Sequence, residues 1–394
     1  MKSRSIYLDH NATTPLHPEV RKAMEPFWET LFGNPSSLHA SGRAVARELK
    51  QARRDVAAFL GARDESEIVF TSGGTESNNA AFRSALWTQK GKRKIVTTAV
   101  EHSSILKLTK ALQEEGVGID LVPVAADGAL DLEKLHLSIT PETALVSVMG
   151  ANNETGVLFP VEEIGKRVRE KGVLFHIDAV QTVGKIPVRL QDLPVDFLSL
   201  SAHKLGGPKG VGVLSIRKTV PFRPFCFGGG QERGRRAGTE NVPGIIGLAA
   251  ACRRLQSTMT GENRKVLEFR NHFEREVLRT LPGVEVNGNP ENRLPNTSNL
   301  AFKGVDSEAL LILLDEAGVA ASSGSACLSG APEPSHVLKA MGFSNERCKS
   351  SVRFSFGPEN TLSEIGEAVK LIRQFVTRLR EIDLKEQHPH SVVQ

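Results

Sequence analysis

Between about residues 66 and 216 the chain repeats one pattern, a short β-rich run followed by a stretch with helical periodicity. Several of the runs, such as ALVSVM at 144–149, are apolar at both odd and even positions, as strands covered on both faces should be. Strands that alternate with helices in this way predict an α/β fold with a mostly parallel, seven-stranded sheet and helices on both sides. The seven runs are Glu67–Thr71, Lys94–Val100, Ile119–Val124, Thr143–Met149, Val173–Asp178, Asp196–Ala202 and Gly210–Ile216.

The pattern changes after about residue 258. A polar helix is predicted over 261–281, followed by short strands near 284–287, 297–303 and 351–356 with helices between them, and by a long terminal helix. That last helix starts at Thr361, which with Glu364 has the spacing of a capping box. Upstream of the sheet, a helix with apolar positions 45, 49, 52, 56, 59 and 60 is predicted between a Ser41 cap and Gly61. We therefore predict a large domain over 15–258 and a smaller α+β domain made of 1–14 and 259–394.

Composition excludes several classes of protein. The chain has 394 residues, of which 40% are hydrophobic, enough for a sizeable core. Apolar runs such as 245–252 fall far short of the roughly 20 residues that span a bilayer, and no apolar stretch follows the basic N-terminus, so a cytoplasmic protein without membrane contact is expected. The net charge of +5 is spread along the chain, and its densest basic stretch, 43–54, reads as the solvated side of a helix. With one Tyr and two Trp, direct nucleic-acid binding is not expected.

The four cysteines stand far apart, without CxxC or Cys/His spacing, so neither a metal site nor a disulfide framework is predicted. Cys226 lies between two phenylalanines and Cys252 among alanines, surroundings typical of buried thiols. Cys348 lies in a polar loop between Arg347 and Lys349, whose charge could make the thiol reactive, but it is interpreted as a bystander. Cys327 differs from these three, because small residues on both sides suit a mobile loop that carries a thiol in and out of a site.

Polar residues follow the predicted strands, at the edge where ligands bind in open α/β sheets. The first strand leads into Ser72-Gly73-Gly74-Thr75, a turn whose free N–H groups could hold an anion at a helix N-terminus. Later strand ends lead to His102, Asn153, Asp178, Gln181 and Lys204. Each of these residues alone has an ordinary structural explanation.

The combination favours one cofactor. A phosphate-binding Gly/Thr turn, a His to stack on a ring, an Asp for a pyridinium nitrogen and a Lys for a Schiff base are the parts that pyridoxal phosphate requires. The chain has neither GxGxxG nor GxxxxGK[ST], so dinucleotide and P-loop sites lose support.

Eleven segments between residues 7 and 357 resemble one family, the cysteine desulfurases of the NifS/IscS type. These are fold-type I pyridoxal-phosphate enzymes among the class-V aminotransferases. No single segment is specific, but together they are. The segments are YLDHNATTP (7–15), FGNPSSLH (32–39), FTSGGTESNN (70–79), EHSS (101–104), NNETG (152–156), HIDAVQ (176–181), SAHKLGGPKG (201–210), RRAGTEN (235–241), SSGSAC (322–327), EPSHVLKAMG (333–342) and VRFSFG (352–357).

The resemblance implies a role for each matching residue. Lys204 would form the Schiff base, Asp178 would hold the ring nitrogen and Gln181 the ring hydroxyl oxygen, while His102 would stack on the ring and relay protons. Asn153 and Arg353 would bind the substrate carboxylate, and Asn34 would line the substrate pocket. The residues implied at the phosphate are Gly74, Thr75, Ser201 and His203, with Thr239 of the neighbouring subunit, so a homodimer is expected.

The resemblance also implies the reaction. L-cysteine would be converted to L-alanine while the Cys327 thiolate takes the sulfur as a persulfide. The 26 positions from Cys327 to Arg353 match the family's longer loop, which goes with large protein acceptors. An iron–sulfur cluster scaffold or another sulfur-acceptor protein would then be the partner. Nitrogenase maturation, general cluster assembly and tRNA thiolation all stay open as pathways.

Three other functions remain to be weighed. A selenocysteine lyase would keep most of the same residues. An aminotransferase needs no thiol beside the cofactor, so Cys327 disfavours it. A non-catalytic sulfur-relay or scaffold protein is disfavoured because Lys204, Asp178 and Cys327 are all present.

Overall fold

The computed structural model describes residues 5–323 and 334–387, with side chains described up to residue 382. Its centre is a seven-stranded sheet with the strand order β2-β8-β7-β6-β5-β3-β4. Strands β3 to β7 pair in parallel, and only β8 runs antiparallel to its neighbours β2 and β7. The strands are β2 (Ile68–Thr71), β3 (Lys94–Thr98), β4 (Gly118–Val122), β5 (Thr143–Met149), β6 (Leu174–Asp178), β7 (Phe197–Ser201) and β8 (Gly212–Ile216). Each lies within two residues of its predicted run, so the predicted mostly parallel, seven-stranded α/β sheet is confirmed.

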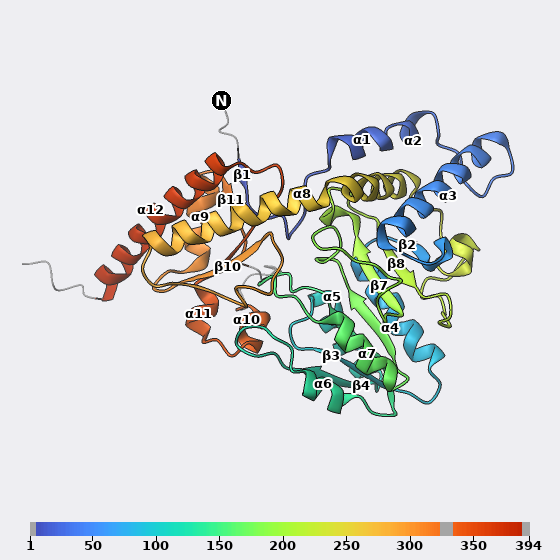
Figure 1. Cartoon of the computed structure of the whole chain (residues 1–394), viewed down its shortest axis with the longest axis horizontal. Coiled ribbons are helices and arrows are strands. Elements are labelled where there is room, and N and C mark those ends of the chain that lie inside the picture. Colours follow the sequence, from blue (N-terminus) through green and yellow to red (C-terminus); the bar gives the residue numbers. More distant parts are fainter. Residues whose placement is uncertain (1–4, 324–333, 388–394) are drawn as a thin grey trace, which may run out of the picture.

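Helices cover both faces of this sheet, as its apolar strands require (Figure 1). Apolar residues of α4 (Gly74–Thr88) and α5 (Ser103–Glu114) form one buried cluster with the sheet. Residues of α3 (Ala40–Leu60), α6 (Leu132–Ser138), α7 (Val161–Glu170) and α8 (Val242–Thr280) form the cluster on the other face. The short helices α1 (Pro18–Met24) and α2 (Pro26–Glu29) also pack on α8. Strand β5 is buried along its whole length, which explains why its sequence shows no polar face.

Helix α8 differs from the prediction. It runs for 39 residues without a break and passes through residue 258, where a new domain and then a separate helix at 261 were expected. Gly261 lies in open space within it, and a single exposed glycine costs a helix only about 1 kcal/mol. The first half of α8 packs on α3 and the second half on α12, so this helix joins the two parts of the molecule (Figure 1). The domain boundaries at 14 and 258 remain a prediction.

The second part contains two small sheets beside helices. One is antiparallel with the order β12-β10-β9, and the other pairs β1 with β11. Their apolar side chains share one buried cluster with α8, α9 and α12, centred on Phe273, Phe302 and Phe354. The elements are β1 (Ile6–Tyr7), β9 (Val284–Val286), β10 (Thr297–Phe302), α9 (Ser307–Glu316), β11 (Val319–Ala320), α10 (His336–Ala340), α11 (Asn345–Lys349), β12 (Ser351–Ser355) and α12 (Leu362–Gln387).

Of the two helix caps predicted from the sequence, one is confirmed and one is wrong. The capping box is confirmed, since Thr361 N donates to Glu364 Oε2 and Glu364 N donates to Thr361 Oγ1. The predicted Ser41 cap is wrong, because α3 begins at Ala40 and the His39 ring accepts from Gly42 N instead. No helix in the described ranges is long and apolar enough to cross a membrane.

A buried ion pair lies where the two parts meet. Glu274 of α8 accepts two hydrogen bonds from Arg293, at 2.6 and 2.5 Å, and the two side chains are only 10% and 3% exposed. Arg293 also pairs through its main chain with Val157, in a loop that follows β5. Because both charges are removed from water, each depends on the other for compensation.

We expect Glu274→Ala to lower the free energy of unfolding by about 3 kcal/mol, because it leaves the Arg293 charge buried without its partner. The measurement is the thermal midpoint together with a denaturant titration. Glu276→Ala on the same helix is the matched control, since its pair with Arg279 lies at the surface and should contribute little to stability. Equal losses in the two variants would contradict this account of the junction.

Candidate active site

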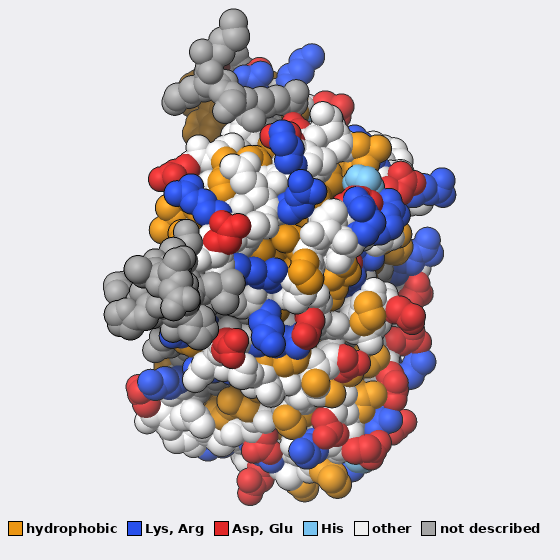
Figure 2. All heavy atoms as spheres, turned by 90° about the vertical axis from the view of Figure 1, so that its left-hand side faces the viewer, with side chains coloured by type: hydrophobic (Ala, Val, Ile, Leu, Met, Phe, Trp, Pro, Cys, Tyr) orange, Lys and Arg blue, Asp and Glu red, His pale blue; other side chains and the backbone are white. Residues whose placement is uncertain are grey.

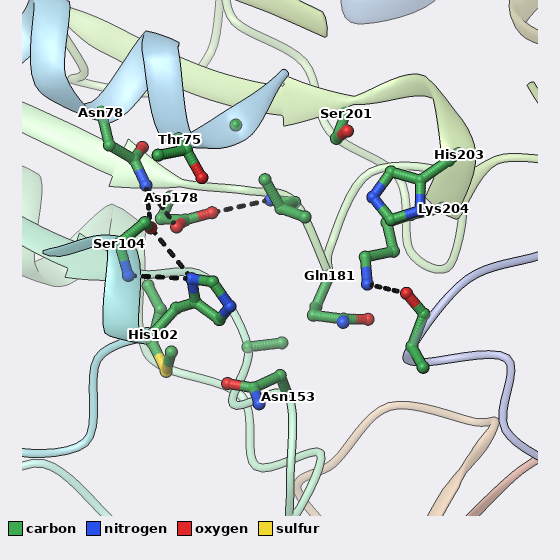
Figure 3. A pocket seen from close by; sticks show the side chains of 15 residues that line it. Thr75, Asn78, His102, Ser104, Asn153, Asp178, Gln181, Ser201, His203 and Lys204 are labelled. Atoms are coloured by element: carbon green, nitrogen blue, oxygen red, sulfur yellow. Dashed lines mark hydrogen bonds between the residues drawn. The ribbon is translucent and has the colours of Figure 1, made fainter. Parts of the chain in front are cut away.

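A cavity of about 270 Å³ opens at the carboxyl ends of the parallel strands (Figure 3). It brings together nine of the predicted site residues from separate stretches of the chain. Sequence reasoning had placed these residues one by one at strand ends, and parallel pairing gathers those ends at one edge. The nine are Gly74, Thr75, His102, Asn153, Asp178, Gln181, Ser201, His203 and Lys204.

The glycine-rich turn between β2 and α4 forms one side of the cavity. Gly73 has φ 153°, a conformation that favours glycine, and a Cβ on Gly74 would lie 2.7 Å from Val180 Cγ2. The turn therefore brings the N-terminus of the 15-residue α4 close to the cavity, with Thr75 in its first turn. Free N–H groups at such an end, beside Ser201 and His203, suit a phosphate (Figure 3).

Asp178 ends β6 with a carboxylate that is almost fully buried. Its Oδ1 accepts from Val180 N at 3.0 Å, and its Oδ2 accepts from Asn78 Nδ2 at 2.9 Å. Neutral donors thus hold it, and a cationic group in the cavity would compensate its charge. Asn78 Oδ1 is buried without a hydrogen-bond partner among the described residues. Sequence reasoning missed Asn78, although it stands in the same quoted segment as Thr75.

His102 is held by the start of α5. Its Nδ1 accepts from Ser104 N at 3.1 Å, so the neutral ring carries its proton on Nε2. Ser104 Oγ in turn accepts from Asn78 Nδ2 at 3.0 Å, which links His102 to the Asp178 network (Figure 3). Loss of water around the ring lowers the pKa of His102, although the nearby Asp178 opposes this shift. A neutral imidazole with an Nε2 proton is therefore expected at this wall of the cavity.

Lys204 follows β7 in a short turn, and its amine reaches the N-terminal segment. Nζ donates to the main-chain oxygens of Asn11 and Ala12, at 2.5 and 2.7 Å. Burial, with a smaller contribution from the charge of Arg353, lowers the pKa of Lys204 to about 8. An amine with this pKa has a substantial neutral, nucleophilic fraction near neutral pH.

Two more buried carboxyl groups lie close to the cavity. Glu101, directly before His102, accepts from Thr98 Oγ1 at 2.7 Å and from Met149 N at 3.0 Å. Burial raises the pKa of Glu101 to about 8, with a smaller contribution from Asp178, so it is protonated at neutral pH. Burial also raises the pKa of Glu154, whose Oε2 accepts from Ser335 Oγ at 2.5 Å.

Arg353 lies beside the cavity rather than in its lining. Its Nη1 donates to Asn153 O at 3.0 Å and its Nη2 to Asp9 Oδ1 at 2.8 Å, while its Nε is buried without a hydrogen bond to the described residues. The guanidinium therefore already touches the loop of Asn153, the other predicted carboxylate ligand. A substrate carboxylate would share it with Asp9.

Two predicted residues, Asn34 and Thr239, are not brought to this cavity in the single chain. Asn34 Oδ1 accepts from Ser36 N in a turn before α3, and neither Asn34 nor Thr239 lines the cavity. Cys327 lies outside the described residues. The described stretches on either side of it reach the site, because Ser322 pairs with the main chain of Arg353 and His336 Nε2 lies 2.9 Å from Glu101 O.

The three described cysteines differ in exposure. Cys252 is buried as predicted, whereas Cys226 is exposed, so its predicted burial is wrong. It lies on a surface segment whose flanking Phe225 and Phe227 are themselves 38% and 68% exposed. Cys348, expected in a polar loop, is buried in α11, and burial raises the pKa of its thiol. Within the described ranges no group of His, Cys, Asp and Glu could hold a metal ion.

Comparisons with known proteins agree with this geometry. The family model described as Aminotransferase class-V matches residues 6–367. The cysteine desulfurase of Trichormus azollae is 49% identical over 96% of this chain and 94% of its own, and the cysteine desulfurase NifS of Azotobacter vinelandii is 48% identical with the same coverage. A solved structure described as a NifS-like protein superposes with a TM-score of 0.89 at 38% identity, over 95% of this chain and 100% of that one. Another, described as SspA in complex with cysteine, has a TM-score of 0.80 at 32% identity, over 91% and 100%.

These matches span nearly the whole chain and confirm the resemblance drawn from its eleven segments. The protein belongs to the NifS-type cysteine desulfurases, within the class-V aminotransferase family of pyridoxal-phosphate enzymes.

Proposed function

We propose that this protein is a pyridoxal-phosphate-dependent cysteine desulfurase that converts L-cysteine to L-alanine and passes the sulfur on through Cys327. The observation that carries the proposal is the convergence of Lys204, Asp178 and His102 on one cavity whose glycine-rich side suits a phosphate. The family membership supports the same activity.

The residues present fit the cofactor. Gly74 leaves no room for a side chain beside Val180, so the N-terminus of α4 stays open to a phosphate, with Thr75, Ser201 and His203 beside it. The buried carboxylate of Asp178, which neutral donors hold among the described residues, would take the ring nitrogen, and Gln181 the ring hydroxyl oxygen. When bound, the cofactor supplies an electron sink that weakens the substrate carbon–sulfur bond.

The remaining steps fall to side chains of this protein. Lys204 would hold the cofactor covalently, and its amine, once released, could take up or give up a proton near neutral pH because its pKa is about 8. His102 presents its Nε2 proton at the cavity wall. Arg353 and Asn153 hold the substrate carboxylate, and Asp9 keeps the guanidinium oriented.

Sulfur transfer is assigned to Cys327. Its thiolate attacks the sulfur of the bound cysteine, so that a sulfur–sulfur bond forms as the carbon–sulfur bond breaks. The electron pair stays with carbon, which takes a proton to give alanine. The persulfide then passes its outer sulfur to an acceptor protein of iron–sulfur cluster assembly or tRNA thiolation.

The working unit is proposed to be a cytoplasmic homodimer. Thr239 does not line the cavity of its own chain, so the phosphate contact expected of it requires a second subunit. Three large side chains in the surface segments around residues 28–34 and 226–239, Trp28, Phe32 and Phe227, are between 67% and 76% exposed. Exposed aromatic groups of this size are typical of subunit interfaces.

Lys204→Ala should abolish turnover. No other described amine lines the cavity, so borohydride should fix the cofactor on the peptide containing residue 204 in the wild type and nowhere in the variant. Mass spectrometry of the reduced protein makes the measurement. Lys209→Ala, at an exposed lysine in the same loop, is the matched control and should behave as wild type. Full activity in Lys204→Ala would refute the cofactor assignment.

Arg353→Ala should raise the KM for cysteine by about tenfold to a hundredfold, because a bidentate guanidinium–carboxylate contact in a closed site is worth roughly 1.5–3 kcal/mol. Arg353→Lys should recover only part of this loss, since an ammonium cannot reproduce the planar fork. Steady-state kinetics measure the effect, with the exposed Arg373→Ala as control. A KM that stays at the wild-type value in Arg353→Ala would remove this residue from the substrate site.

Cys327→Ser separates cofactor chemistry from sulfur chemistry. A hydroxyl is far less acidic than a thiol and cannot hold a persulfide sulfur, so the variant should bind cofactor and cysteine normally but release no alanine. In the wild type, mass spectrometry after one turnover without acceptor should find one extra sulfur on the peptide containing Cys327.

The other three cysteines are internal controls for this experiment. Serine at Cys226, Cys252 or Cys348 should leave the reaction largely intact. An active Cys327→Ser protein with the extra sulfur on Cys348 would overturn the assignment of the nucleophile and leave the cofactor assignment untouched.

A further inference from the structure

Asn11 lies at the centre of the polar contacts behind Lys204. It is 1% exposed, and its main-chain oxygen accepts from Lys204 Nζ at 2.5 Å and from Gln181 Nε2 at 2.9 Å. Asn11 also joins the two parts of the molecule, because its side chain and its main-chain N–H group form hydrogen bonds with residues of both parts. Its remaining partners are Asn153 O, Thr297 Oγ1, Ser355 Oγ, Asn296 Nδ2 and Lys185 Nζ.

Lys185 brings a second amine to this cluster. It is 9% exposed, and its Nζ donates to Asn11 Oδ1 at 3.3 Å and, through a shorter contact, to Gln181 Oε1. Within the part of the chain that the structure describes, Lys185 forms no ion pair with a carboxylate. Its amine therefore lies among neutral acceptors, close to the site but outside the cavity lining.

Burial holds the pKa of Lys185 well below its ordinary value, and the charges of Lys204 and Arg353 act in the same direction. A neutral amine has two N–H donors, which match its two acceptors, Asn11 Oδ1 and Gln181 Oε1. Lys185 can thus serve as a hydrogen-bond donor without placing a second full charge beside Lys204.

The two ends of the Gln181 amide are fixed by different partners. Asn11 O can only accept, so Gln181 Nε2 must face it, and Lys185 supplies the donor for the opposite Oε1. Turning the amide over would place its oxygen against the Asn11 oxygen. Without Lys185, Oε1 would become a buried acceptor with no donor, and the amide would relieve that cost by leaving its present position.

We propose that Lys185 is a positioning residue of the active site, which holds the Gln181 amide at the cavity wall and the Asn11 carbonyl against the Lys204 amine. The inference rests on the proposed function, because it takes Gln181 as a contact of the cofactor. Lys185 would touch neither cofactor nor substrate and would act through Gln181.

The test is a double-mutant cycle on the dissociation constant of pyridoxal phosphate, measured by release from the holoenzyme. Lys185→Met keeps an unbranched side chain that ends one atom short of the lysine and removes the donor, and Gln181→Met removes the amide. Each single variant should raise the dissociation constant by about fivefold, the worth of one hydrogen bond. The double variant should add less than about twofold to either, because both changes remove one linked contact.

Val266→Ala is the matched control for lost packing. Val266 is 3% exposed and lines the same small chamber of about 70 Å³ as Lys185, without a polar contact to Gln181. Val266→Ala should lower the thermal midpoint and leave the dissociation constant within about twofold of wild type. When it is combined with Gln181→Met, the fold-changes in the dissociation constant should multiply, as they do for independent sites. The proposal would be overturned if the fold-changes of Lys185→Met and Gln181→Met also multiplied, or if Lys185→Met left the dissociation constant unchanged.

Two further outcomes are informative. If the wild type itself bound no pyridoxal phosphate, the proposed function would fail rather than the role of Lys185 alone. Should Lys185→Met not accumulate as folded protein, the double variant with Gln181→Met tests the same contact, because it removes the buried acceptor together with its donor. The double variant should then accumulate as folded protein, as Gln181→Met alone does. A double variant that fails to accumulate while Gln181→Met alone folds would overturn the contact.

Discussion

The parallel pairing of β3, β5, β6 and β7 is the constraint on which the site depends. Parallel strands place all their carboxyl ends at one edge, so each following loop delivers one side chain to the same place. His102 follows β3, Asn153 follows β5, Asp178 ends β6 and Lys204 follows β7. The register keeps these ends level, since Met149 pairs with Asp178 and Asp178 with Ser199. A shift of one residue in any pair would move a functional side chain by more than 3 Å.

Features that depend on local sequence could be predicted, and contacts between distant segments could not. The seven strands were predictable because their apolar runs are set by burial on both faces, and Asp178 stood out as a carboxylate at the end of such a run. Asn11 and Lys185 gave no comparable signal, since their roles come from contacts 170 and 174 positions apart in sequence. The unbroken helix α8 was hidden for another reason, because its first half is apolar and its second half polar, as two separate helices would be.

The cysteines illustrate the same limit. Cys226 between two phenylalanines has the sequence surroundings of a core residue, yet all three lie on an exposed surface segment. Apolar neighbours indicate burial only if the segment packs against the core, and this one packs so little that Phe227 is 68% exposed. An interface in the proposed homodimer would give these neighbours their apolar surroundings, which a single chain cannot supply.

Burial favours the neutral form of several ionisable groups in the site, while one ion pair is kept. Burial lowers the pKa of His102, Lys185 and Lys204 and raises that of Glu101, so in each case the neutral form gains. Arg353 and Asp9 remain as an ion pair, because each compensates the other. The protein thus keeps few fixed charges around the cavity, and those that the cofactor and substrate bring are the ones that the site is arranged to compensate. In the proposed function, a phosphate would meet the N-terminus of α4, a protonated ring nitrogen would meet Asp178, and a substrate carboxylate would meet Arg353. The same desolvation that lowers the pKa of Lys204 would strengthen the attraction between these groups and the ligands that neutralise them.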